Sequence, residues 1–284
     1  MENIWIIYAL SYGILKGVRE CMKKIALKKS GLMEILFFYM LVGFVFTLPD
    51  LKSALLLAPA LVFWIFVKSV FVSTGFILSF MAIKRMPISL YSVVILAQMV
   101  FTTIFGVIFL KEPFGIYNII GLALVIAGLV MVNFKKDGDN KREFKFVALI
   151  MAVAYCFFNA ISATMDKVLM RDMTSGQLQF WFMFFSVIIY GIIIVVRKEK
   201  ISLKTLKTNF WIPVMGILLM VGDRLLFEAN GHPDSKVTVI TLLIQCAVIV
   251  SILIGRFVFK EKNILYKLIC SCIIISGIAV ALIK

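Results

Sequence analysis

Long apolar stretches separated by short polar turns repeat along the whole chain. A helix that crosses a bilayer needs about 20 mainly apolar residues, and hydropathy together with the polar turns marks ten such stretches. They cover residues 4–26, 32–48, 55–83, 90–110, 116–134, 146–170, 180–196, 211–229, 237–259 and 264–283. The pattern predicts an all-α integral membrane protein with ten transmembrane helices.

The two halves of the chain resemble each other. A shift of 149 positions places Lys111-Glu112 on Lys260-Glu261, each pair in the turn of a helical hairpin. The same shift places Gly106 on Gly255 and Gly128 on Gly277. A shift of 143 positions places Tyr12 on Tyr155 and Lys24 on Lys167. A long internal repeat decides the whole architecture. We therefore expect two five-helix repeats, at 1–134 and 146–284, joined by a polar linker at 135–145. Five spans is an odd number, so the second repeat is expected to be inverted.

The distribution of basic residues agrees with this inversion. Assigning the loops of the ten-helix arrangement to two faces places 20 Lys and Arg residues on one face and 6 on the other. Basic loops stay on the cytoplasmic side of a membrane. The linker is therefore expected in the cytoplasm, and both termini outside the cytoplasmic membrane.

Composition narrows the class of protein further. The chain has 284 residues, 62% of them hydrophobic and 16% charged, which leaves no room for a soluble domain. A net charge of +15 is explained by the basic loops, and no nucleic-acid recognition module accompanies it. The five cysteines lie in apolar runs without metal-ligand or disulfide spacing, so no metal or cofactor is expected. The first apolar stretch lacks a cleavage signal and is expected to remain as a helix.

Several short motifs stand out, some repeated near the ends of the two halves and one opening the fourth helix. They are Phe109-Leu110-Lys111-Glu112 and Val258-Phe259-Lys260-Glu261, the glycines Gly128 and Gly277, and Met86-Pro87-Ile88-Ser89. With the five-plus-five pattern, the chain resembles the drug/metabolite transporter superfamily, specifically its ten-helix EamA-type members, over essentially its full length. The resemblance implies an alternating-access carrier with a central pocket for amino acids, cationic metabolites, nucleotide-like compounds or sugar phosphates. Two departures, the polar segment 231–236 and the charged first helix, leave the substrate class open.

Charges inside the apolar stretches are the candidate site residues, because a charge at the bilayer centre costs about 2.5–3.5 kcal/mol on insertion scales. Lys68 lies in the middle of the third stretch. It is expected to face a polar pathway, although a lysine can also extend its head group to the membrane surface. In the first helix, Lys16, Arg19 and Glu20 share one face, so Lys16 can pair with Glu20 and leave one cation for an anionic substrate. An ion pair that only lowers the insertion cost is the alternative.

The eighth stretch carries Asp223, Arg224 and Glu228. Asp223 and Glu228, followed by Glu20, are candidates for a proton-coupling carboxylate, because a desolvated acid exchanges protons near neutrality. A structural ion pair between helices is the alternative explanation. Weaker candidates lie in the sixth stretch, and they are Asn159, expected to bind substrate, with Ser162, Asp166 and Lys167. Four residues are expected in a secondary pocket, with packing or interhelical hydrogen bonds as the alternative: Tyr12, Gln98, Tyr155 and Gln245.

These features predict a secondary transporter for a small polar or zwitterionic, amino-acid-like metabolite, working as a monomer or weak homodimer. A zwitterion suits a site that holds both cations and carboxylates. A lipid flippase on the same scaffold is the alternative. No zinc-protease helix and no Gly-x-Ser-x-Gly elbow is present, so an enzyme is not expected.

Overall fold

The structure, a computed structural model, describes residues 4–110, 115–134, 142–233, 235, 237–261 and 264–281, and within them its regular secondary structure is all helical. The helices before residue 135 are α1 (Ile4–Ala26), α2 (Leu32–Thr47), α3 (Leu51–Ala54), α4 (Pro59–Arg85), α5 (Ile88–Val94), α6 (Gln98–Leu110) and α7 (Ile116–Phe134). Those after it are α8 (Arg142–Leu169), α9 (Ser175–Arg197), α10 (Lys204–Thr208), α11 (Trp211–Gly231), α12 (Val237–Ile244), α13 (Cys246–Phe259) and α14 (Ile264–Ala281). Two 3₁₀ turns, η1 (Leu48–Asp50) and η2 (Ile95–Ala97), complete the described elements.

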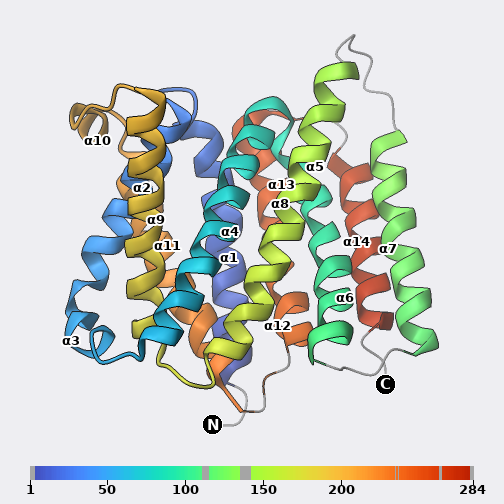
Figure 1. Cartoon of the computed structure of the whole chain (residues 1–284). Helices are drawn as coiled ribbons and strands as arrows, with labels where there is room; N and C mark the ends of the chain where they lie inside the picture. Colours follow the sequence, from blue (N-terminus) through green and yellow to red (C-terminus); the bar gives the residue numbers. More distant parts are fainter. Residues whose placement is uncertain are drawn as a thin grey trace.

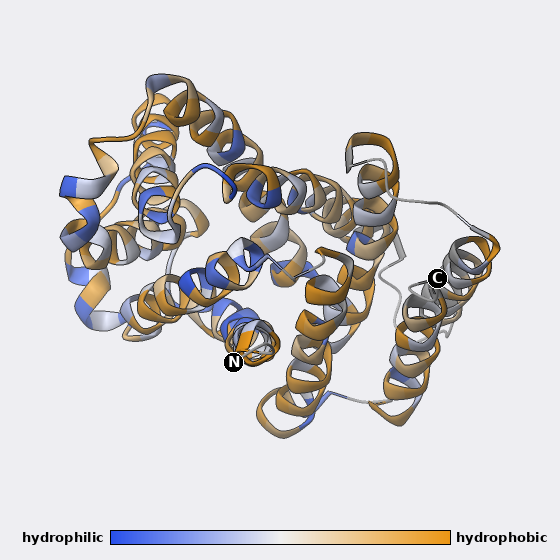
Figure 2. Cartoon of the chain, turned by 90° about the horizontal axis from the view of Figure 1, so that it is seen from below, coloured by the Kyte–Doolittle hydropathy of each residue, from blue (hydrophilic) through white to orange (hydrophobic). Residues whose placement is uncertain are grey.

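Among the described residues, six helical segments are long and apolar enough to cross a membrane: Leu32–Ala54, Pro59–Arg85, Ile88–Phe109, Phe146–Leu169, Ser175–Arg197 and Val239–Phe259. A shorter apolar helix covers Ile264–Gly277. Large apolar side chains lie on the outer surface, among them Leu56, Val195 and Phe257, each more than 70% exposed. Figure 2, which views the bundle from below, shows hydrophobic residues along most of each helix, with hydrophilic positions between them. Such a surface suits a lipid environment.

The fourth long stretch of each half is broken in its middle. The turn η2 separates α5 from α6, and Gln245 separates α12 from α13. A shift of 149 places Leu96, the centre of η2, on Gln245, so the two breaks are related by the repeat. Sequence analysis predicted membrane spans at 90–110 and 237–259, and helical segments of membrane-crossing length cover most of both. The breaks within them were not predicted, because no Pro or Gly lies within seven residues of either one.

The helices of the two halves pack reciprocally. Helix α1 packs against α11 and α13 of the second half, and α8 packs against α4 and α6 of the first. Likewise α2 contacts α11 while α9 contacts α4, and the corresponding helices α7 and α14 pack on each other at one edge of the bundle (Figure 1). Figure 1 also shows that α1 and α8 run in opposite directions. Helices α1, α4, α8 and α11 therefore enclose the interior.

Two glycines let α1 approach α13 closely. Gly13 and Gly17 lie four residues apart, on one face of the helix. A Cβ atom at Gly17 would lie 2.6 Å from the carbonyl oxygen of Ala247, directly after the break at Gln245. Small residues at this spacing allow helix backbones to come together in membranes. The contact fixes the position of α1, along its axis, beside the break between α12 and α13.

Candidate functional site

Helix α1 carries four ionisable side chains on its buried face. Lys16, Arg19, Glu20 and Lys23 follow the spacing i, i+3, i+4 and i+7, and none is more than 5% exposed. Charged side chains are almost never this deeply buried unless they are paired. The groups that pair with these four side chains therefore have to be identified first.

Glu20 pairs with Lys23, not with Lys16. The Lys23 Nζ atom lies 2.7 Å from Glu20 Oε1 and above the rings of Phe76 and Phe80. Lys16 and Lys23 each lie one helical turn from Glu20. The rings of Phe76 and Phe80 also attract the Lys23 ammonium group, which favours the pair with Lys23. The expected Lys16–Glu20 pair does not form in this structure. Lys16 consequently has no ion-pair or hydrogen-bond partner within the described part of the chain.

Two further ion pairs join the halves of the molecule. Arg19 of α1 lies 3.5 Å from Asp223 of α11, measured from Nη1 to Oδ1. Lys68 of α4 lies 2.8 Å from Asp166 of α8, measured from Nζ to Oδ1, between the rings of Phe182 and Phe227. The Lys68 side chain is 2% exposed, so it does not extend to a surface. Both pairs hold helices of opposite halves together in the bundle interior.

A small polar cavity of about 50 Å³ lies beside these pairs. Its wall comes from α1, α6, α8, α11 and α12, and so from both halves. Its polar side chains are Tyr12, Lys16, Gln98, Asn159, Ser162, Asp166, Asn230 and Thr241. The Asn159 amide donates to Gln98 Oε1 at 2.7 Å, which joins α8 to α6 below the break in the fourth helix. The structure therefore brings Lys16, Asn159, Tyr12 and Gln98 to one cavity.

Arg224 and Glu228 lie outside the cavity wall. Arg224 binds the carboxylate of Asp50, and its Nε donates to Gln179 Oε1 at 2.7 Å. Glu228 accepts a hydrogen bond from the Ser175 hydroxyl. The Arg224 and Asp50 side chains are 30% and 27% exposed. These contacts fasten α11 to α9 and to the turn before α3.

Tyr155 and Gln245 also lie outside the cavity wall. The Tyr155 ring stacks on Tyr91, with 6.4 Å between centroids. The Gln245 amide donates to the carbonyl of Thr241, one turn earlier in α12, at 3.0 Å. The first contact packs α8 on α5, and the second lies at the break between α12 and α13.

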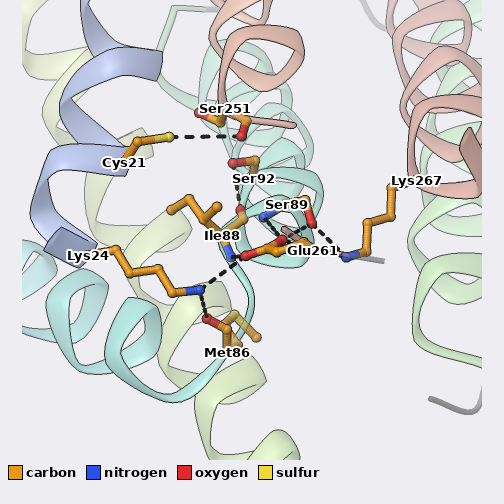
Figure 3. A network of polar contacts seen from close by, with 9 residues as sticks. All are labelled: Cys21, Lys24, Met86, Ile88, Ser89, Ser92, Ser251, Glu261 and Lys267. Carbon is orange, nitrogen blue, oxygen red and sulfur yellow. Dashed lines mark hydrogen bonds and ion pairs between the residues drawn. The ribbon is translucent and has the colours of Figure 1, made fainter. Parts of the chain in front are cut away.

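A second polar cluster surrounds Glu261, in the turn after α13 (Figure 3). Its carboxylate accepts from the backbone amides of Ile88 and Ser89 at 2.7 and 3.0 Å, and so caps α5. Lys24 of α1 lies 3.1 Å from the carboxylate and donates to the carbonyl of Met86 at 3.2 Å. Lys267 of α14 donates to the Ser89 hydroxyl, which in turn donates to Glu261.

The electrostatics of Glu261 follow from these contacts. Burial alone would raise the pKa of its carboxyl group, but the hydrogen bonds from Ser89 and Ile88 and the charge of Lys24 outweigh burial, and the pKa is lowered. The carboxylate is therefore ionised under ordinary conditions. It joins the second half of the chain to the start of α5 in the first half.

The corresponding position of the second half shows a related contact. Lys167, which the repeat relates to Lys24, lies near the end of α8 and donates to the carbonyls of Asn230 and Ser235 at 2.9 and 3.0 Å. It also donates to the Ser235 hydroxyl at 2.8 Å. Each lysine thus ties the end of its helix to the turn before the broken fourth helix of its own half. Figure 1 places the ends of α1 and α8 at opposite ends of the bundle.

Sequence reasoning missed the importance of several residues. Asp166, only a weaker candidate from the sequence, is the partner of Lys68, and Asn230 and Thr241, which were not candidates, line the cavity. Nothing in the sequence signals such contacts, because the partners are far apart in the chain. The Lys260-Glu261 turn was noticed as a repeated motif, and its capping contact was not. Its first-half counterpart, Lys111-Glu112, lies outside the described residues.

Comparison with known proteins gives the family. The model of the EamA-like transporter family matches residues 3–134 and again residues 146–283. A solved protein structure with 13% sequence identity superposes with a TM-score of 0.70, covering 99% of this chain and 97% of its own. No curated protein matches the sequence. The two family matches together span most of the chain and give it a two-repeat architecture. The chain therefore belongs to the EamA-like transporter family, and is a multi-pass membrane transporter of the drug/metabolite transporter superfamily.

Proposed function

We propose that the chain is a secondary transporter that carries a small polar or zwitterionic, amino-acid-like metabolite across the cytoplasmic membrane by alternating access. Ten membrane-spanning helices form two inverted five-helix repeats, and the protein acts as a monomer or weak homodimer. The observation that carries the proposal is the polar cavity between the repeats, lined by Lys16, Gln98, Asn159 and Asp166. Inverted-repeat transporters bind substrate at such a midplane position.

Reciprocal packing supports the inverted arrangement. Helix α1 contacts α11 and α13 as α8 contacts α4 and α6, which is the pattern expected when a twofold axis in the membrane plane relates the halves. The charges in α1 and α11 explain why length and hydropathy alone do not identify these two helices as spans.

The contacts of Lys24 and Lys167, which we call the two lysine ties, support alternating access. Lys24 holds the turn before α5 at one end of the bundle, and Lys167 holds the turn before α12 at the other. Both turns lead into helices whose breaks lie beside the cavity. Releasing one tie while the other holds would open the cavity toward one side at a time.

The lipid flippase alternative is weaker on this geometry. A groove of about 520 Å³ between α7 and α14 opens at the bundle edge, lined by Leu124, Leu268, Ile273 and other mostly apolar residues. It shares no lining residue with the polar cavity. A charged head group in the cavity would therefore have no described lateral route for its acyl chains.

Transport is tested by reconstitution. Purified protein is screened by thermal shift against amino acids, organic acids, amines and organic phosphates, and each stabilising solute is then measured for uptake into proteoliposomes. We expect saturable uptake that protein-free liposomes lack. Asn159→Leu should reduce it at least tenfold, while Lys200→Met, at an exposed position, should not. Equal uptake with and without protein would contradict the proposal.

Proton coupling is part of the same proposal, with Asp223 as the first candidate, followed by Glu228 and Glu20. Asp223 lies at an interface between the repeats, 3.5 Å from Arg19 and next to the cavity wall. An inward proton gradient should speed uptake by the wild-type protein, and Asp223→Asn should remove this effect. Full gradient dependence in both Asp223→Asn and Glu228→Gln would rule these carboxylates out.

A further inference from the structure

The buried charges around the cavity do not balance. The described interior holds four cations there, Lys16, Arg19, Lys23 and Lys68, but only three carboxylates. Each carboxylate already has its cation: Glu20 binds Lys23, Asp166 binds Lys68 and Asp223 binds Arg19. Lys16 is the cation left without a carboxylate within the described residues.

Lys16 lies where a ligand can reach it. Its side chain is 5% exposed and forms part of the cavity wall. It stands between Gly13 and Gly17, whose close contacts with the backbone beside Gln245 fix this stretch of α1. The ammonium group is therefore held at the cavity by a rigid segment and is not free to leave for a membrane surface.

The other polar groups of the wall leave no anion free for Lys16, because the one carboxylate among them, Asp166, is paired with Lys68. Gln98 and Asn159 bind each other, the Thr241 hydroxyl donates to the Val237 carbonyl at 2.6 Å, and the Asn230 amide donates to the Leu226 carbonyl at 3.0 Å. These are neutral groups. A buried ammonium group that has no carboxylate of its own carries a large desolvation cost unless an anion joins it.

Resting on the proposed function, we infer that the substrate carries a carboxylate that binds Lys16 Nζ, and that Lys16 is the main determinant of this specificity. A substrate carboxylate restores the missing negative charge. No unpaired carboxylate among the described residues awaits a substrate ammonium, so the site favours organic acids over amines. The 50 Å³ cavity is large enough for a few water molecules or one carboxylate group, and the remainder of the substrate enters when the bundle opens.

The inference is tested by thermal shift of the full-length protein in detergent at constant ionic strength. Sodium acetate, propionate and benzoate are compared with their neutral amides and with ethylamine and benzylamine. At least one carboxylate should raise the Tm while its amide and the amine do not. Lys16→Met should abolish this shift, Lys16→Arg should keep part of it, and Lys200→Met should keep all of it.

A second readout separates a binding role from a structural one. Because Lys16 is a buried charge without a partner, Lys16→Met should raise the Tm of the ligand-free protein. Lys16→Gln is a second neutral variant if the methionine variant folds poorly. A carboxylate shift that persists in the neutral variants, or equal shifts by acids and amides, overturns the inference. Uptake of a neutral solute that does not depend on Lys16 would overturn the carboxylate inference and leave the transporter proposal intact. Carboxylate binding that depends on Lys16, without any uptake, would support the inference and contradict the transporter proposal.

Discussion

At the scale of single residues, the buried ion pair between Lys68 and Asp166 makes a direct prediction. Lys68 and Asp166 are 2% and 6% exposed, so removing either one leaves a buried charge alone. Breaking a buried pair from one side costs about 3–5 kcal/mol of unfolding free energy. Lys68→Met and Asp166→Asn should each lose about this much, and the double variant should regain most of it.

A double-mutant cycle of unfolding free energies, measured in detergent, checks this prediction. The cycle isolates the coupling between the two side chains from their separate packing effects. Losses that simply add in the double variant would mean that the Lys68–Asp166 contact contributes nothing to folding.

Glu261 gives a pH prediction. Its pKa in the folded protein lies below its ordinary value of 4.5, because the hydrogen bonds from Ser89 and Ile88 and the charge of Lys24 outweigh the effect of burial. The stabilisation from a depressed carboxyl pKa is complete above the ordinary value and is lost as pH falls through the folded value. The Tm gap between wild type and Glu261→Gln should therefore be constant from pH 7 to about pH 5 and close below it. A gap that widens on acidification would contradict this sign.

Single residues also show which features of the site the sequence could and could not predict. Hydropathy identified Lys16, Arg19, Glu20 and Lys68 as unusual, because charges in apolar stretches are visible without a structure. Helical spacing offered only partners within the same helix. The Arg19–Asp223 pair joins residues 204 positions apart, so no local pattern predicted it.

At the scale of helices, Gly17 tests the contact between α1 and α13. An added Cβ would lie 2.6 Å from the Ala247 carbonyl oxygen, so one helix has to move. Gly17→Ala should lower stability by about 1–3 kcal/mol, the usual cost of overpacking. Gly191→Ala is the matched control, because its Cβ would meet only Phe37 at 3.7 Å and alanine favours a helix. In thermal unfolding, the Tm of Gly17→Ala should fall below that of the wild type, and the Tm of Gly191→Ala should rise above it.

The lysine ties make a prediction at the same scale. Lys24→Met removes contacts to the turn before α5, and Lys167→Met removes contacts to the turn before α12. Amide hydrogen exchange, followed by mass spectrometry, should rise at 86–92 only in the first variant and at 235–241 only in the second. Each variant is the control for the other. Faster exchange at both turns in both variants would indicate general destabilisation and not two separate ties.

The helices themselves were largely predictable, and their breaks were not. The stretch predicted at 116–134 coincides with α7, and the stretch predicted at 4–26 coincides with α1. Long apolar runs bounded by polar turns give such limits directly. The breaks at η2 and Gln245 escaped prediction because no Pro or Gly marks either position in the sequence.

At the scale of the whole molecule, the repeat was visible in the sequence through its charges and glycines. The offset that related Lys24 to Lys167 anticipated a pair of corresponding contacts at opposite ends of the bundle. The charge imbalance at Lys16 was not visible, because it depends on which cation each carboxylate binds. An account of charge pairing requires the packed structure.

The orientation of the molecule in the membrane is the last prediction. The imbalance of 20 to 6 basic residues between the two faces predicts that the 135–145 linker is cytoplasmic and that residues 4 and 281 lie near the outer surface. A fluorescent protein that matures only in the cytoplasm should fluoresce when inserted in the linker and not when fused after residue 284. Alkaline phosphatase, active only outside, should give the reverse pattern. If both positions report the same side, an odd number of spans in the second half is excluded, and the inverted repeat with it. If both results are exchanged, the inverted repeat stands and only the charge argument for orientation is wrong.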